Sequence, residues 1–97
     1  MPTYIILMNY TDQGIRNIKE SPALIEAGDK ALEGLGGKLI GAYTVMGQYD
    51  RVAIVELPSD EVAMTSTLGL SAAGNVRTTT LKAFPREQFA EMIKKLP

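Results

Sequence analysis

A short polar turn at the middle of the chain constrains the fold more than any other feature. Residues 47–50, Gly-Gln-Tyr-Asp, separate two runs rich in β-branched and aromatic residues, 38–46 and 51–57. Glycine and aspartate favour chain reversal, and such runs are typical of strands. The pattern predicts a central pair of strands joined by this turn, around which the rest of the chain must be arranged.

A strand and a helix are predicted before the central pair. Residues 3–9 form a run so rich in apolar residues that both faces of the strand should be covered. From Ile15 onward the apolar spacing is helical, with one face pointing inward. Ser21 and Pro22 suit the start of a helical turn, and the glycine pair at 36–37 ends the helix.

A second helix and strand are predicted after the central pair. Ser59 is a good helix cap, and the following helix is expected to run to about Ala73 with Met64 and Leu68 facing inward. Residues 76–84 form the fourth strand. A last helix opens at Pro85 and carries a single apolar stripe at i, i+3, i+4 and i+7: Phe89, Met92, Ile93 and Leu96.

The order of these elements predicts one α+β domain over residues 1–97 with the ferredoxin-like βαββαβ topology. With right-handed crossovers, the four-stranded antiparallel sheet takes the order 4-1-3-2. The two helices between the strands lie on one face, and the C-terminal helix is an addition. The second face of the sheet stays open.

The open face is expected to be covered by another copy of the chain. Val52 and Ile54 alternate with Ala53 and Val55, so the third strand is apolar on both sides. An exposed apolar sheet face marks an interface, and twofold dimers are the commonest oligomers. Two sheets packed face to face would make a dimeric α/β barrel, with or without a cavity between them.

Composition excludes several classes of function. The 97 residues are 45% apolar and 22% charged, with a net charge of −1 and no cysteine, histidine or tryptophan. No disulfide, thiolate site or histidine-ligated metal or haem is therefore expected, and no cofactor is predicted. The charge gives no reason to expect nucleic acid or an acidic membrane surface. Without a signal peptide or an apolar segment of spanning length, a cytoplasmic location is expected.

Polar segments gather at one edge of the predicted sheet. Residues 9–12, 47–51 and 75–77 are distant in sequence, yet the topology brings them together where the first and second strands end. There, Asp12 and Asp50 are expected near Arg16, Arg51 and Arg77. The candidate ligand-binding residues are Asn9, Tyr10, Asp12, Tyr43, Gly47, Tyr49, Asp50 and Arg77.

Each candidate also has a structural interpretation. A carboxylate beside a guanidinium keeps its charge and is a poor base unless it is partly buried, so Asp50 suits a turn as well as a site. Tyr49 is placed to donate a hydrogen bond to an oxyanion. A Gly-x-x-Asp turn requires its glycine for backbone reasons alone. Tyr43 is favoured as a packing residue.

Several spaced motifs together resemble the GYD-domain family, named after its Gly-x-Tyr-Asp turn. The likeness extends from Pro2 to the last helix. It is carried by Asn9-Tyr-Thr-Asp-Gln-Gly-Ile-Arg16, Gly47-Gln-Tyr-Asp50, Gly74-Asn-Val-Arg-Thr78 and Leu81-Lys-Ala-Phe84. The resemblance implies a ferredoxin-like fold related to dimeric α/β barrels, in a family of unknown function. Members often carry tryptophan where this chain has Tyr10 and Thr44.

Three functions remain open at this point. The first is a homodimer that binds a small, largely apolar molecule between its two sheets. The second is a cofactor-independent enzyme of the small monooxygenase or isomerase type, an analogy at the level of fold alone. The third is an interaction module without any ligand. An enzyme predicts a polar group in an enclosed pocket, a binding protein an apolar pocket, and an interaction module no pocket.

Overall fold

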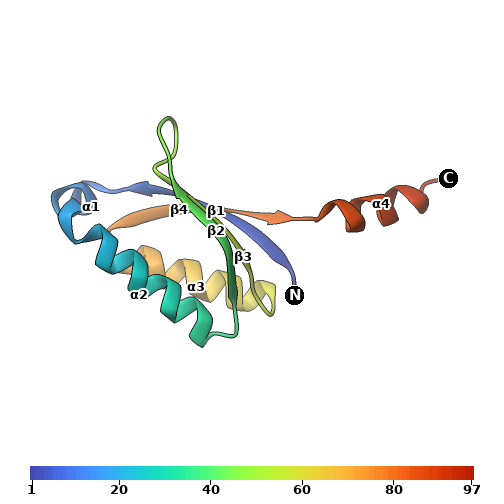
Figure 1. The fold of residues 1–97 in the computed structure, drawn as a ribbon, viewed down its shortest axis with the longest axis horizontal. Coiled ribbons are helices and arrows are strands. Elements are labelled where there is room, and N and C mark those ends of the chain that lie inside the picture. Colours follow the sequence, from blue (N-terminus) through green and yellow to red (C-terminus); the bar gives the residue numbers. More distant parts are fainter.

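One four-stranded antiparallel sheet organises the chain. The computed structural model describes residues 1–97, and its strands are β1 (Thr3–Tyr10), β2 (Lys38–Thr44), β3 (Arg51–Glu56) and β4 (Val76–Ala83). The strands lie in the order β2-β3-β1-β4 (Figure 1). This is the predicted order counted from the opposite edge, so the α+β ferredoxin-like topology is confirmed.

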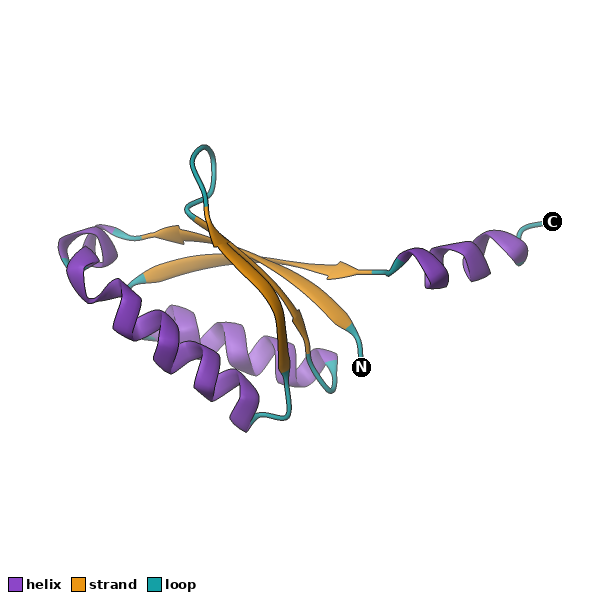
Figure 2. Ribbon diagram, in the orientation of Figure 1, coloured by secondary structure: helices purple, strands orange, loops and turns teal.

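Two long helices lie on one face of the sheet, and a third leaves it. Helices α2 (Ser21–Gly34) and α3 (Asp60–Ala72) lie beneath the sheet, whereas α4 (Arg86–Lys94) continues outward from the end of β4 (Figure 2). Two short elements, α1 (Asp12–Arg16) and the 3₁₀ turn η1 (Ile18–Glu20), connect β1 to α2.

The helical segment after β1 is broken more often than its apolar spacing predicts. Pro22 has no N–H to bond the preceding turn, and its ring clashes with a helical carbonyl four residues earlier. The chain therefore restarts as a new helix with Pro22 in its first turn. As a result Ile15 and Ile18 do not face inward as predicted; they are 56% and 43% exposed.

Side-chain and backbone caps fix the helix ends. Thr11 Oγ1 accepts a hydrogen bond of 3.1 Å from the Gly14 N–H. Ser59 Oγ accepts one of 3.2 Å from the Val62 N–H, as its predicted cap role requires. After α2, Gly36 takes a φ of +83°, a conformation that a side chain would strain. The chain turns from α2 into β2 at this glycine.

The core forms between the sheet and the two helices. Alternate residues of β1 and β3 face the helices, as the strand period of two dictates. With Leu32 of α2 and Ala63 of α3, they make up the buried apolar cluster: Tyr4, Ile6, Met8, Ala53, Val55 and Leu57. Of the two apolar sides predicted for the third strand, the one with Ala53 and Val55 faces the helices.

The predicted inward pair of α3 is wrong. Met64 and Leu68 are 62% and 61% exposed, whereas Ala63 and Thr67 are buried. Small residues allow a helix backbone to lie close to a sheet, so the side of α3 with the smaller side chains faces the strands. Met64 and Leu68 instead border a shallow groove between α3 and β4.

The other face of the sheet carries apolar side chains without a covering layer. Ile5 and Leu7 on β1 pair with Ile54 and Val52 on β3, and all four are only half-buried. Leu81 on β4 is 46% exposed. We call the surface made by these five residues the open sheet face.

The chain exposes more surface than its mass predicts. Its accessible area is 6758 Å², whereas a folded monomer of 10.5 kDa is expected to expose about 5,400 Å². Helix α4 contributes to the excess, because none of its residues is buried. The molecule is correspondingly elongated, with extents of 53 × 30 × 19 Å.

None of the helices combines the length and the apolar character needed to cross a membrane.

Candidate functional site

Three polar segments meet where β1 ends, as predicted. The Asn9 side chain donates a hydrogen bond of 2.8 Å to the Gln48 carbonyl. The Thr11 N–H donates one of 3.1 Å to the Asn75 carbonyl, and its hydroxyl donates one of 2.6 Å to the Gly74 carbonyl. Segments from the first, middle and last thirds of the chain are thus joined by direct bonds.

Asp50 holds β1 at two points. Its N–H donates a hydrogen bond of 2.9 Å to the Met8 carbonyl, and its Oδ2 accepts one of 2.9 Å from the Tyr10 N–H. Because a partly buried N–H without a partner is costly, this geometry gives the carboxylate a backbone-holding role. The ion pair of the neighbouring Arg51 is with Asp29 of α2, and not with Asp50 or Asp12.

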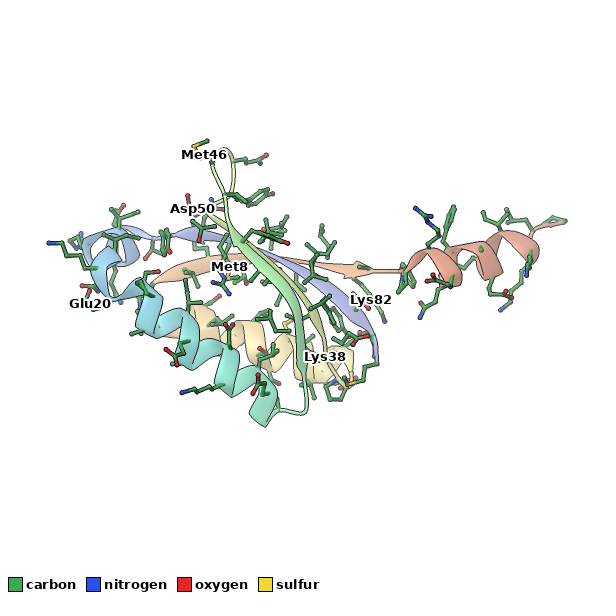
Figure 3. All side chains as sticks on the ribbon, viewed as in Figure 1. Met8, Glu20, Lys38, Met46, Asp50 and Lys82 are labelled. Atoms are coloured by element: carbon green, nitrogen blue, oxygen red, sulfur yellow. The ribbon has the colours of Figure 1, made fainter.

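The rest of the turn projects beyond the sheet. Gly47 has a φ of +118°, so the glycine of the motif is required by the backbone. Figure 3 shows Met46 at the tip of this loop and Asp50 at its base, on the sheet. Tyr49 is half-buried, and no hydrogen bond of its hydroxyl is present. The motif is foremost a turn between β2 and β3.

The remaining candidates are divided between two faces. Tyr43 is 67% exposed and lies opposite Val52, on the side of the open sheet face. Arg77 is also exposed and lies opposite Asn9 on that side. Asp12 is exposed in the first turn of α1. Of the eight candidates, only Tyr10 and Asp50 border the space between the sheet and the helices, so the eight do not form one site.

A cavity of about 400 Å³ lies between the sheet and the two helices. We call it the helix-side cavity. Its floor is formed by strand residues of the core, and its walls by α2 and α3. The apolar side chains along it include Ile6, Met8, Leu24, Ile25, Leu32, Leu35, Leu39, Val55 and Leu70.

Polar groups gather where β1 ends and β3 begins. The Tyr10 hydroxyl and Ser21 Oγ are 2.6 Å apart. The Arg51 side chain is 13% exposed, and its Nη2 lies 3.5 Å from Oδ1 of Asp29. This distance is longer than a well-formed charge-assisted hydrogen bond. Asp50 borders the same end of the cavity, which therefore holds one guanidinium and two carboxylates.

Two glycines lie within the helices that form the walls. Gly28 is in α2 and Gly69 in α3, and both border the helix-side cavity. Glycine in a helix interior costs about 1 kcal/mol relative to alanine. A methyl group at Gly28 would come no closer than 3.9 Å to Leu70, and one at Gly69 would meet nothing within 4 Å. Packing within this chain therefore requires neither glycine.

A separate polar cluster lies at the start of α3. The Tyr4 hydroxyl donates a short hydrogen bond to Asp60, whose carboxylate also pairs with Lys82 at 3.0 Å. Burial of the ring, followed by the hydrogen bond to Asp60, raises the pKa of Tyr4 to about 12. The same bond and the one from Lys82 lower the pKa of Asp60. The cluster ties β1, α3 and β4 together.

Sequence reasoning missed the cavity and its charged pair. Asp29 looked like one more polar residue on an amphipathic helix, and nothing in the spacing connected it to Arg51. The available signal was glycine. Gly28 and Gly69 interrupt otherwise helical segments, where glycine costs stability relative to alanine.

Comparisons with known proteins identify the family. The model of the GYD domain matches residues 4–93. A protein from Thermus thermophilus named "Glutamine synthetase and cystathionine beta-lyase binding protein" is 34% identical over 97 residues, which cover 99% of each chain. The crystal structure of TTHA0845 from the same organism covers 89% of this chain and 100% of its own, with a TM-score of 0.52 and 28% identity. This chain belongs to the GYD domain family.

Proposed function

We propose that this chain is a protein-binding module that pairs with itself through the open sheet face and binds a metabolic enzyme through α4. The observation that carries the proposal is the exposure of α4, whose apolar residues have no partner in the chain. Phe89, Met92 and Ile93 are 57%, 42% and 48% exposed, and Leu96 just beyond the helix is 65% exposed.

A helix of this kind requires a partner. Isolated helices shorter than about 12–15 residues are marginal in water, and α4 has nine residues. Its apolar residues recur at the spacing that anchors an amphipathic helix in a partner's groove. Phe84, 53% exposed just before the helix, extends this apolar surface. We call Phe84, Phe89, Met92, Ile93 and Leu96 the α4 stripe.

The relative's name suggests the kind of partner. A protein with 34% identity along its whole length is named as a binding protein of glutamine synthetase and cystathionine beta-lyase. We assign the same kind of partner, an enzyme of amino-acid metabolism, to the α4 stripe of this chain. An enzyme's own activity would then be the quantity that binding changes.

Self-association is the second part of the proposal. The surface in excess of the monomer expectation is about 1,300 Å², whereas a standard interface buries about 800 Å² on each partner. The excess is therefore larger than the area that one standard contact buries on each partner. A face-to-face pair of sheets would cover Ile5, Leu7, Val52, Ile54 and Leu81 at once.

Binding to purified enzymes tests the α4 stripe. Glutamine synthetase and cystathionine beta-lyase from the organism that encodes this chain are titrated with the wild-type chain and with the double variant Phe89→Ser, Met92→Ser. We expect the double variant to weaken binding at least about a hundredfold, since buried aromatic and methionine anchors dominate such interfaces. Glu87→Ser, on the opposite side of α4, is the matched control and should leave binding unchanged.

Sedimentation velocity tests the open sheet face. Ile54→Lys places a charge in its centre and should raise the dimer dissociation constant at least about tenfold, while Ala23→Lys on the exposed side of α2 should not. A wild-type chain that is monomeric at micromolar concentration would refute this part. Loss of the dimer in the Phe89→Ser, Met92→Ser variant would assign the α4 stripe to self-association and refute its role in enzyme binding.

A second candidate function is the binding of a small, largely apolar molecule between the two sheets of such a dimer. The observation that favours it is the position of Tyr43, a residue that is 67% exposed and lies on the side of the open sheet face. Arg77 lies on the same side. A ligand held there should raise the melting temperature of the wild type and not that of a monomeric Ile54→Lys chain.

A further inference from the structure

We infer that the helix-side cavity is a binding site for an uncharged amphiphile, a molecule with an extended apolar tail and one polar head. The site lies on the opposite face of the sheet from the proposed dimer contact. It belongs to a single chain, so it does not depend on the proposed function. Its volume of about 400 Å³ is within the range of sites that hold small ligands.

The walls of the cavity support an occupant. Gly28 and Gly69 keep the middle of α2 and α3 free of side chains where both border the cavity. Glycine is the least favourable helix residue after proline, and neither position has a neighbour that a methyl group would strike. The two glycines therefore leave the backbone of both walls open to an occupant of the cavity.

The lining indicates a long apolar tail. From Met8 the floor continues along Ile6, Ala53 and Val55 toward Leu39, and all of these residues border the cavity. Leu24 of α2 and Leu35 just beyond its end border the cavity, yet they remain 47% and 42% exposed. An alkyl chain lying along this floor would cover both leucines, which the fold of the chain leaves incompletely buried.

The polar end determines the head group. Arg51 contributes one positive charge there, and Asp29 and Asp50 contribute two negative charges, so a carboxylate head would add to an excess of negative charge. An ammonium head would meet the guanidinium, while both carboxylates already have partners, Asp29 in Arg51 and Asp50 in the Tyr10 N–H. A hydroxyl or amide head can both donate and accept without placing a charge near either group, and we assign this class.

Three probes with one tail test the head-group assignment. Decanol, decanoate and decylammonium are titrated below their aggregation concentrations at neutral pH into the full chain labelled at leucine and isoleucine methyl groups. We expect saturable NMR shifts at Leu24, Leu32 and Leu70, with decanol binding roughly tenfold or more tightly than either ion. Equal binding of all three probes, or shifts on the open sheet face instead, would overturn the assignment.

Filling the cavity from a wall tests the position of the site. Gly28→Leu places a side chain in the cavity without the helix penalty of glycine, and it should weaken decanol binding at least tenfold. Gly34→Leu, at the last residue of the same helix with nothing within 4 Å of its Cβ position, is the matched control. Unchanged binding in Gly28→Leu, with the variant folded by circular dichroism, would refute the site.

A charge substitution at the polar end tests the head-group assignment. The quantity measured is the preference for decanol over decanoate, which a loss of stability alone would not change. Asp29→Asn removes one negative charge beside Arg51, and should narrow the preference for decanol over decanoate at least threefold. Glu26→Gln removes the same charge from an exposed pair with Lys30 in the same helix and should leave the preference unchanged. An unchanged preference in Asp29→Asn would refute the charge argument. Loss of self-association in Gly28→Leu, without loss of decanol binding, would assign the cavity to a protein segment instead.

Discussion

The N–H of Tyr10 donates a hydrogen bond of 2.9 Å to Oδ2 of Asp50, 40 residues further along the chain. Tyr10 is the last residue of β1, and Asp50 directly precedes β3, which pairs with β1. The side chain of Asp50 thus extends the hydrogen bonding between the two central strands past the last pair of residues that their backbones join. In this chain the last residue of the Gly-x-Tyr-Asp motif closes the sheet at the edge where the polar segments meet.

Replacement of Asp50 should therefore lower stability. Asp50→Ala leaves the Tyr10 N–H without its acceptor, and we expect a loss of about 1–3 kcal/mol in the free energy of unfolding. Asp50→Asn retains an amide oxygen in the same place and should lose less. Urea unfolding at one fixed protein concentration measures both, because the stability of an associating protein depends on concentration. Unchanged stability in Asp50→Ala would contradict the role deduced from this hydrogen bond.

Gly14 should tolerate no side chain. A methyl group there would collide with the carbonyl oxygen of Asn75, a backbone atom that is already bonded to Thr11. We expect Gly14→Ala to destabilise the fold by about 2 kcal/mol, in the range of overpacked sites. Gly34→Ala, where the space is free, serves as the control and should be neutral or stabilising. The two unfolding midpoints in urea should move in different directions.

The glycines of α2 and α3 that border the helix-side cavity should show the opposite behaviour. Gly28→Ala and Gly69→Ala each remove an unfavourable helix residue without a clash, so each should raise the free energy of unfolding by about 0.5–1 kcal/mol. Gly36→Ala is the contrasting change, because its φ of +83° strains any side chain, and it should destabilise. A loss of stability in both cavity variants would show that the chain itself needs these glycines.

Alkaline pH should weaken the fold through Tyr4. The pKa of Tyr4 is raised from 10.0 to about 12 by burial and by its bond to Asp60. Between these values the unfolded chain loses the phenolic proton while the native chain keeps it, so stability falls as pH rises from about 10 to 12. Tyr4→Phe should flatten this part of the pH dependence of the urea midpoint. An equal slope in the variant and the wild type would contradict the prediction.

Acid should lower the stability of the fold through Asp60, the carboxylate of the same cluster. The pKa of Asp60 is lowered below its ordinary 3.8 by hydrogen bonds from Tyr4 and Lys82. Its contribution to stability is therefore complete above about pH 4 and is lost as pH falls through the folded pKa. Lys82→Met removes one of these bonds and brings the folded pKa of Asp60 closer to its ordinary value, so the total loss of stability on acidification should be smaller than in the wild type. Lys94→Met, in α4, should leave the acid limb unchanged.

The topology could be predicted from the sequence because it depends on the order of the elements and on the spacing of their apolar residues. The β-branched runs, the central turn and the Ser59 cap all indicate the same arrangement, and the structure contains it. The inward side of α3 could not be found in this way. Its larger apolar residues, Met64 and Leu68, lie away from the strands, and Ala63 and Thr67 face the core because they are small.

The part of the candidate site that depends on strand direction could be predicted, and the part that depends on side-chain placement could not. The meeting of residues 9–12, 47–51 and 75–77 followed from strand direction alone, and hydrogen bonds confirm it. The pairing of Arg51 with Asp29 depends on how far α2 lies from β3. Packing between the helix and the strand sets that distance, and no local sequence pattern predicts it.

The isolation of α4 has a consequence for how such a chain can change over generations. No residue of α4 is buried, so substitutions there leave the core of the monomer intact. Foldability and partner choice are then encoded in separate stretches of one short sequence. A lineage could exchange one partner for another by altering a few residues after Pro85, without passing through a form that fails to fold.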